Sequence, residues 1–379
     1  MYDNKVRELV LERILADGMN VEQTIRSLER EFLLELSPGF IYDVIYDKTR
    51  QLDMAEHRRK VLDLFSGTLC IDELHLGRNI LLLATDPLMD IPVAFALVDQ
   101  NDQNHMGRFL RNLAKTGLAP RVVVTDGSNL YPALLKEIWK DAVHQLCVFH
   151  VIKDINKLIL EGVRRLRAVM SRRGNSGRKK KRGRKGAKSR VTSRSMTLKD
   201  KAYFVFKRRF LIVKRKENLT KTEQEDLILM LEYMPELVTL RRFSDRIYWL
   251  FDTPKNLHQA SCRLSVLMRD AKFQSVPELA KALKQLDGEK FMKMMAYLGD
   301  PVNKRVRTNN HVERANRVIR YLEKVRYKWR RRKTLVRFIV LKLDRIWKKL
   351  RSPNDSGEAG QSKTSKRTQD MINPQLQPT

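Results

Sequence analysis

Cysteine is scarce in this chain, with only Cys70, Cys147 and Cys262 among 379 residues. A disulfide framework uses a larger and even number of cysteines, so the sequence predicts a reducing, intracellular setting. Residues 1–4 also lack a basic stretch followed by an apolar one. We therefore expect no secretory signal.

Long apolar runs are missing as well. The longest apolar segment, residues 79–98, is interrupted by Asp86, Pro87 and Asp90. A membrane-spanning helix needs about 20 mostly apolar residues in succession, so we expect no transmembrane helix. The hydrophobic content of 42% still allows folded cores, and the length of 379 residues suggests two or three domains.

Acidic residues are in the minority. The chain has 76 Lys and Arg against 44 Asp and Glu, a formal net charge of +32. This excess predicts a polyanionic partner, with nucleic acid as the first expectation and a membrane surface as the alternative. Because the longest apolar segment is too interrupted to span a bilayer, we favour a cytoplasmic, nucleoid-associated protein with no membrane partner.

Residues 1–60 are predicted to form a helical domain. Asn20 can cap one helix, with Gln23 as its return partner three residues later. Ser37 and Pro38 can begin the next, because Ser accepts from the free amides and Pro suits the first helical position. The outline of helix, short turn and helix is typical of a helix-turn-helix that reads DNA.

Residues 42–50 are the candidate recognition helix of this domain. Lys48 and Arg50 are its candidate DNA contacts. The same segment also carries Asp43 and Asp47, so a small helical bundle without DNA contacts is the alternative.

The spacing of apolar residues changes after residue 67, where short apolar runs replace the helical spacing of the preceding segment. Three consecutive strands followed by alternating helices and strands are typical of the α/β class, here a ribonuclease-H-like mixed sheet with helices on both faces. The expected strands are 68–72, 79–85, 91–98, 122–126 and 142–146, and the expected helices are 105–115, 130–140 and 147–160.

The remaining chain divides by composition. Residues 171–190 hold 11 Lys or Arg and no acid, which favours a mobile insertion that is either a phosphate-binding loop or a nuclear-localisation-like signal. The predicted domains after residue 60 are the first part of the core (65–165), a basic flexible segment (166–196), an all-helical insertion (197–300), two final helices (301–350) and a disordered tail (351–379).

Two carboxylates follow apolar strands in the expected core. Asp72 ends the first predicted strand and Asp126 ends the fourth. A single Asp at such a place is commonly a turn or capping residue, but two on neighbouring strands can share a divalent cation through hard oxygen ligands. The sequence leaves open whether Asp72 or Glu73 faces the ions.

Glu313 is the candidate third ligand. It lies on a predicted helix on which Asn316 and Arg317 share its face, because residues three and four apart are neighbours. A solvated helix face with an ion pair is the alternative for Glu313 taken alone.

Four motifs then occur in a fixed order: Ile-Asp72-Glu, Val-Thr-Asp126-Gly-Ser, Cys147-Val-Phe-His150 and Asn-Asn-His-Val-Glu313-Arg. Over residues 65–350 this combination resembles the DDE transposases of bacterial insertion sequences. It is most similar to the broad group that includes Mutator-like enzymes, which carry a Cys-x-x-His signature and an all-helical insertion.

The resemblance implies Asp72, Asp126 and Glu313 as a catalytic triad that holds Mg²⁺, with Mn²⁺ as a possible substitute. It also implies metal-dependent DNA cleavage and strand transfer on double-stranded DNA, both at the terminal inverted repeats of the element and at the target. One active site per DNA end implies a homo-oligomer on DNA. A transposase-derived regulator without cleavage activity and a plain metal-dependent nuclease are the alternatives.

Cys147 and His150 admit two interpretations. They could form half of a zinc site with His258 and Cys262, but two unlike pairs so far apart are a weak zinc signal. We favour structural support of the sheet and the metal site by a buried Cys and a hydrogen-bonded His.

The C-terminal helices are strongly basic. We expect the predicted DNA-backbone contacts Arg326, Lys328, Arg330, Arg331, Arg332 and Lys333 to give affinity without sequence preference. Phe338 and Trp347 share helical spacing with Ile339 and Leu343, so we expect these two aromatic side chains to pack inward.

Overall fold

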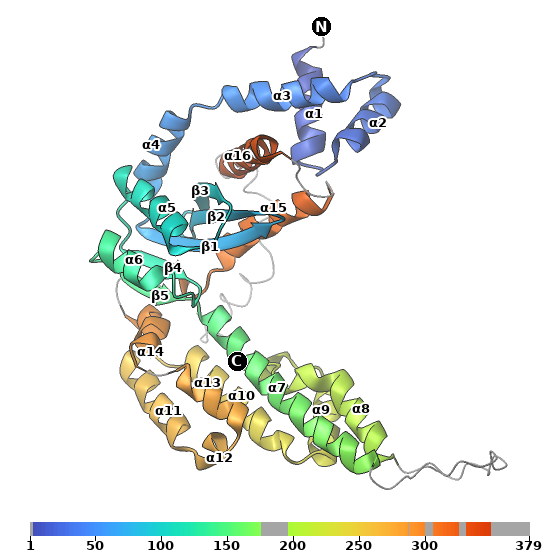
Figure 1. Ribbon diagram of the computed structural model, residues 1–379, viewed down its shortest axis with the longest axis vertical. Coiled ribbons are helices and arrows are strands. Elements are labelled where there is room, and N and C mark those ends of the chain that lie inside the picture. Colours follow the sequence, from blue (N-terminus) through green and yellow to red (C-terminus); the bar gives the residue numbers. More distant parts are fainter. Residues whose placement is uncertain (1–2, 176–195, 287, 300–305, 326–330, 350–379) are drawn as a thin grey trace, which may run out of the picture. The chain divides into compact units, whose positions relative to one another are not determined.

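The computed structural model describes residues 3–175, 196–286, 288–299, 306–325 and 331–349 (Figure 1). These residues form two compact units, the first made of the chain up to Ala119 together with the chain from Asn310 onward, the second of Pro120–Asn309. The division therefore falls inside the predicted core of 65–165, between its third and fourth strands. The predicted contacts Arg326, Lys328 and Arg330, most of the basic segment and the tail lie outside the described residues.

The first unit begins with helices whose ends follow the predicted caps. Asn20 and Gln23 form a reciprocal capping box, and the Ser37 hydroxyl accepts from the Phe40 amide just after Pro38. The helices are α1 (Asn4–Leu15), α2 (Val21–Phe32), α3 (Pro38–Arg50) and α4 (Met54–Leu64).

A helix from the other end of the chain completes this bundle. Phe338 and Leu341 of α16 (Arg332–Lys349) belong to the same buried cluster as the apolar faces of α1, α2 and α3. Trp347 packs against Val61 and Ile91. The prediction that Phe338 and Trp347 pack inward is confirmed, and the N-terminal helices share their core with the C-terminal helix.

The sheet of the first unit is antiparallel. It contains β1 (Thr68–Leu76), β2 (Asn79–Asp86) and β3 (Ile91–Val98), with Asp72 of β1 opposite Leu83 of β2. The expected end of the first strand at Asp72 is wrong. The strand continues because Leu74 and Leu76 extend its alternating pattern and are both buried, which places Asp72 in the middle of β1.

Helices cover this sheet. α15 (Asn310–Val325) packs against β1 and β2, while α5 (Gln103–Lys115) and α16 contact β3. The turn between β2 and β3 is held by buried Asp86, which accepts from the backbone amides of Ser66, Leu88 and Met89. A carboxylate surrounded by so many donors is a structural element of the turn.

The second unit begins with a β–α–β segment. β4 (Val122–Thr125) and β5 (Val143–Leu146) pair in parallel, with α6 (Tyr131–Ile138) between them. β4 is fully buried and ends at Thr125, one residue before the predicted end at Asp126. Together the two units have three antiparallel and two parallel strands among the described residues, an α/β composition consistent with the ribonuclease-H-like class.

The rest of the second unit is helical over its described residues. Its long helix α7 (Val148–Asn175) contacts α8, α10 and α13, and Arg165 of α7 makes two hydrogen bonds, of 2.7 and 3.0 Å, with Glu278 of α13. The others are α8 (Leu198–Arg208), α9 (Lys221–Tyr233), α10 (Leu237–Asp252), α11 (Leu257–Arg269), α12 (Ala271–Gln274), α13 (Pro277–Lys284) and α14 (Gly288–Met295).

One predicted boundary is corrected here. The basic flexible segment was expected from residue 166, whereas α7 remains helical to Asn175. Arg has a high helix propensity and basic residues are favourable near a helix C-terminus, so the first basic residues extend the helix. Along the described parts of the chain, no helix is long and apolar enough to cross a membrane.

Candidate active site

Asp72 is held by a side chain from a distant part of the sequence. Asn316 of α15 donates a hydrogen bond of 2.8 Å from its Nδ2 to Asp72 Oδ2. Asn316 is buried, and its Oδ1 has no hydrogen-bond partner among the described residues. A buried carbonyl oxygen beside a carboxylate is a pair of hard donors of the kind that Mg²⁺ prefers.

Glu313 lies one turn before Asn316 on the same helix. The first turn of α15 is anchored by Asp90, whose Oδ1 accepts from His311 and, at 3.0 Å, from Arg314. Hydrogen bonding by His311 lowers the pKa of Asp90 below its ordinary value, and the charges of His311 and Arg314 act in the same direction. The turn between β2 and β3 thus fixes the start of the helix that carries Glu313.

Asp126 lies in a turn of the second unit, and its Oδ1 accepts from the Ser128 amide at 2.9 Å. It lines a pocket of about 280 Å³ together with residues that come from α7 and from the helical insertion. His150, Gln285 and Lys290 are the polar members of this pocket that carry nitrogen donors. That His150 supports a metal site stays a prediction.

Cys147 is a buried junction of the second unit. Its backbone amide donates to the Thr125 carbonyl at 2.8 Å, and its Sγ accepts from the Asn309 amide at 3.1 Å. The next amide, of Val148, donates to the Arg307 carbonyl at 2.9 Å. Cys147 therefore ties Asn309 to the end of β4 within the second unit. Its support of a metal site stays a prediction.

His144 lies on β5, the strand that pairs with β4. Its Nε2 hydrogen-bonds to Thr125 Oγ1 at 2.8 Å. Burial and, to a smaller extent, the charge of Lys293 lower the pKa of His144 from 6.5 to about 4, while Glu289 acts in the opposite direction. His144 is consequently neutral at physiological pH.

The described residues contain no group of three or more His, Cys, Asp or Glu side chains close enough to hold a metal ion. Asp72 and Glu313 belong to the first unit and Asp126 to the second. The meeting of all three at one site remains a prediction. The described residues also contain no such group at the alternative zinc site. Of its four candidate ligands, His258 Nε2 and Cys262 Sγ lie 3.6 Å apart on α11.

Residues 69–336 match the family model of the ISL3 group of DDE transposases, whose description is "Transposase". The match covers more than half of the chain. The chain belongs to this transposase family. Membership supports an insertion-sequence transposase and implies a DNA-cleaving enzyme with DNA as its partner. No curated protein matches the chain significantly.

The candidate DNA contacts of the transposase lie in different surroundings. Lys48 is half-buried, whereas Arg50 is exposed and its guanidinium lies 5.6 Å from the centroid of the Tyr46 ring. Arg331 and Lys333 are exposed. Arg332 instead binds Asp99 and the Leu97 carbonyl, which fixes the start of α16 against the end of β3.

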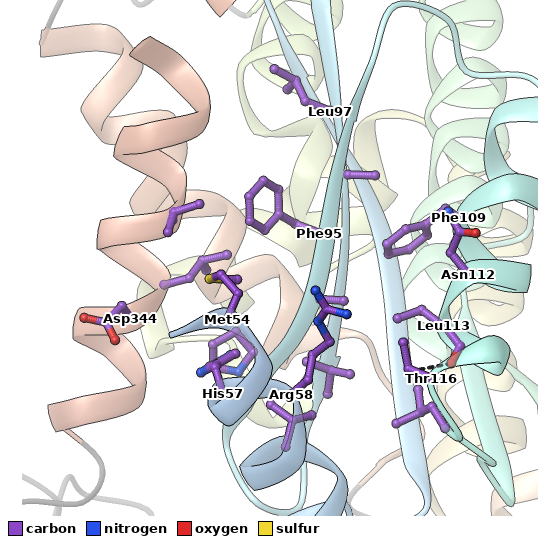
Figure 2. Close-up of a pocket in the computed structure, with 18 of the residues that line it drawn as sticks. Met54, His57, Arg58, Phe95, Leu97, Phe109, Asn112, Leu113, Thr116 and Asp344 are labelled. Atoms are coloured by element: carbon purple, nitrogen blue, oxygen red, sulfur yellow. Dashed lines mark hydrogen bonds between the residues drawn. The ribbon is translucent and has the colours of Figure 1, made fainter. Parts of the chain in front are cut away.

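A cavity of about 820 Å³ in the first unit is lined by α4, β3, α5 and α16. In Figure 2, Phe95 extends from β3, while Phe109 and Leu113 extend from α5. None of the three candidate carboxylates of the transposase lines this cavity.

The sequence does not single out several residues that shape these sites. Asp90 and His311 are separated by more than two hundred positions, so only the folded chain shows their ion pair. Lys290 and Gln285 reach the pocket of Asp126 from the helical insertion. The residue type is the one sequence signal for Asp90. Its φ is 56° at a turn, and Asp tolerates this conformation better than most residues.

Proposed function

We propose that this transposase cuts DNA at the terminal inverted repeats of its element and joins the ends to target DNA. In the proposed site Asp72, Asp126 and Glu313 hold divalent ions, Mg²⁺ or Mn²⁺. The observation that carries the proposal is the hydrogen bond between Asn316 and Asp72, which fixes the helix of Glu313 to the strand of Asp72.

Contacts inside the second unit support the inclusion of Asp126 in the proposed metal site. The Asn309 amide binds Cys147, and the Cys147 amide binds Thr125, the residue before Asp126. Glu313 follows Asn309 by only four residues in the sequence. Asn309, the last residue of the second unit, is therefore held through Cys147 near the end of β4 within that unit.

Each residue has a defined part in the proposed reaction. Bound by the three carboxylates, the ions would stabilise the entering and leaving oxygens as water or a 3′-hydroxyl attacks the phosphodiester in line. Asn316 holds the Asp72 carboxylate in place and presents its own Oδ1 on the same side chain. Lys290, which lines the pocket of Asp126, supplies a cation for a DNA phosphate.

The proposed DNA contacts lie on both terminal segments of the chain. The helix-turn-helix of residues 1–60, with Lys48 and Arg50, would read the element ends, and the basic residues around Arg331 would bind the backbone. Two DNA ends require two active sites, so we propose a homo-oligomer on DNA within the nucleoid. The Mutator-like relation and its Cys147–His150 signature are part of this proposal.

The test is cleavage of a supercoiled plasmid that carries the element ends, incubated with the purified protein in Mg²⁺, Mn²⁺ or EDTA. We expect end-specific cuts and joined products that require the metal. Asp72→Asn, Asp126→Asn and Glu313→Gln should each lower cleavage by about 100-fold or more, as expected when metal stabilisation worth several kcal/mol is lost.

Asp141→Asn is the matched control, because Asp141 is an exposed carboxylate of the second unit. It should cut at the wild-type rate. Binding without cutting in every metal would instead indicate a regulator, and cutting without joined products would indicate a nuclease.

A further inference from the structure

Three aromatic side chains of the helical insertion are exposed in one row. Tyr203 and Phe206 of α8 and Phe210 of the 3₁₀ helix η1 (Arg209–Ile212) are 60%, 37% and 56% exposed. Their spacing of three and four residues places them along one face. We call these residues the aromatic stripe. Large aromatic rings are usually buried, so an exposed row of them indicates a surface that binds something.

Cations lie directly over the rings of the aromatic stripe. The guanidinium of Arg209 lies 4.5 Å from the Phe206 centroid and 4.4 Å from the Phe210 centroid. Arg167 of α7 also lies 4.5 Å from Phe206. None of Arg167, Lys207 and Arg209 forms an ion pair with any carboxylate in the part of the chain that the structure describes. Their positive charge therefore remains available to a ligand.

Neighbouring basic residues of the same segment behave differently. Arg208 pairs with Asp226 at 2.6 Å, and Lys214 pairs with Glu223 at 2.6 Å, both partners lying on α9. These two cations hold α8 and the following residues against α9. Arg167 joins α7 to α8 through the Phe206 ring, whereas Lys207 and Arg209 lie on the same segment as the rings and make no ion pair with another helix in the described chain. Ion pairing between helices therefore does not account for Lys207 and Arg209.

The chemistry of the stripe restricts its partner. Residues 176–195, which join α7 to α8 in the sequence, contain no aromatic residue and many Lys and Arg, so they do not complement a cationic surface. A second copy of the same surface would repel it by like charge. A partner that combines flat apolar rings with negative charge fits both features, and unpaired bases on a phosphate backbone have this combination.

We propose that the aromatic stripe binds single-stranded DNA, with unpaired bases stacked on the exposed faces of Tyr203 and Phe210 and with Arg167, Lys207 and Arg209 on its phosphates. Figure 1 shows α8 beside α7 in the second unit and away from α14, which lines the pocket of Asp126. The proposal rests on the proposed function in one respect, because it takes DNA to be the natural ligand. It does not depend on the catalytic carboxylates.

The experiment measures binding of the full-length protein to a fluorescent thymidine 30-mer and to a mixed-sequence duplex of the same length, in EDTA. Phe210→Ala should weaken binding to the single strand about tenfold, the usual effect of losing one stacking partner, and duplex binding by less than about twofold. Phe210→Trp should bind the single strand as well as the wild type does, since it keeps a stacking ring. Ile228→Ala, at an exposed apolar residue of α9, is the matched control and should change neither.

Several outcomes would overturn the proposal. Unchanged single-strand binding by Phe210→Ala would do so, as would an equal loss on the single strand and the duplex. Binding to anionic phospholipid vesicles that Phe210→Ala weakens, with single-strand binding unaffected, would assign the stripe to a membrane surface. Because EDTA prevents metal-dependent cleavage, a failure of the catalytic proposal leaves this measurement unaffected.

Discussion

Asn316 and Asp72, separated by more than two hundred residues in the sequence, are joined by a hydrogen bond of 2.8 Å. This bond links the middle of β1 to the helix that carries Glu313. Asp86, in the same sheet, shows what a purely structural carboxylate looks like, because it is fully buried and both of its oxygens accept from the Ser66–Met89 turn region. Asp72 is only half-buried, which the proposed role as a metal ligand requires.

Replacing Asn316 tests this relationship. Asn316→Ala removes a hydrogen bond to a charged group, worth about 1.5–3 kcal/mol, and should lower DNA cleavage by roughly 10- to 100-fold. Asn316→Asp should be worse at neutral pH, because it places a second negative charge beside Asp72. Cleavage rates measured over a Mg²⁺ titration check both variants. Asn310→Ala, an exposed Asn of the same helix, should cut normally; an equal loss there would remove the special role of Asn316.

Asp90 anchors α15, and its contribution should depend on pH. Its pKa is lowered in the folded protein, so the stability it provides is present above its ordinary value near 3.8 and is lost as the pH falls through the lower folded value. Asp90→Asn keeps a residue that tolerates positive φ but removes the charge. Because Asp90 is half-exposed, we expect a loss of about 1 kcal/mol or less at pH 7.

Urea unfolding of wild type and Asp90→Asn over a range of pH checks this expectation. The difference in unfolding midpoint should shrink as the pH falls below about 4. A difference that stays constant with pH would show that the effect of the substitution is not electrostatic.

His144 should make the second unit acid-sensitive. Its folded pKa of about 4 lies below the ordinary value of 6.5, so the unfolded chain binds more protons between these values. Stability is present in full above pH 6.5 and falls progressively toward pH 4, by roughly 2–3 kcal/mol for a shift of this size. His144→Gln should flatten this dependence, measured as urea midpoints between pH 7.5 and 4.5. An equally steep loss in the variant would assign the acid sensitivity to other groups.

The shared core of α16 and the N-terminal helices predicts a remote effect of a C-terminal substitution. Phe338→Ala leaves a cavity in the cluster of α1, α2 and α3 and should destabilise this bundle by about 3–5 kcal/mol. Hydrogen exchange of the amides of Asn4–Leu15 should become faster. Phe32→Ala, at an exposed Phe of α2, is the control and should leave the exchange unchanged. Exchange in Phe338→Ala as slow as in the wild type would show that α16 does not stabilise the N-terminal helices.

Much of this fold follows from local sequence signals. The capping box at Asn20 and the Ser37-Pro38 start predict their helices, and the strand from Val122 stops where Asp126 and Gly127 allow a turn. Helical spacing also predicts that Phe338 and Trp347 are buried. Each of these signals lies within a few residues, where propensity and periodicity act.

The features that sequence reasoning misses depend on contacts between distant segments. β1 continues four residues beyond Asp72 to Leu76, because buried apolar residues alternate there. The adjacent acids Asp72 and Glu73 conceal this alternation in the sequence. The ion pairs of Asp90 with α15, and the bond from Asn309 to Cys147, join segments separated by more than 150 residues. No local pattern encodes these partners, because they are chosen by packing.

Iron-mediated cleavage of the protein backbone tests most directly whether the three carboxylates share their ions. Fe²⁺ bound in place of Mg²⁺ reduces added hydrogen peroxide to hydroxide and a hydroxyl radical, ascorbate returns the iron to Fe²⁺, and the radicals cut the chain near the metal. We predict cuts near Asp72, Asp126 and Glu313 together, all suppressed by excess Mg²⁺ and all lost in Asp126→Asn. Cuts confined to the residues of one unit, or cuts near Asp72 that persist in Asp126→Asn, would contradict a shared metal site.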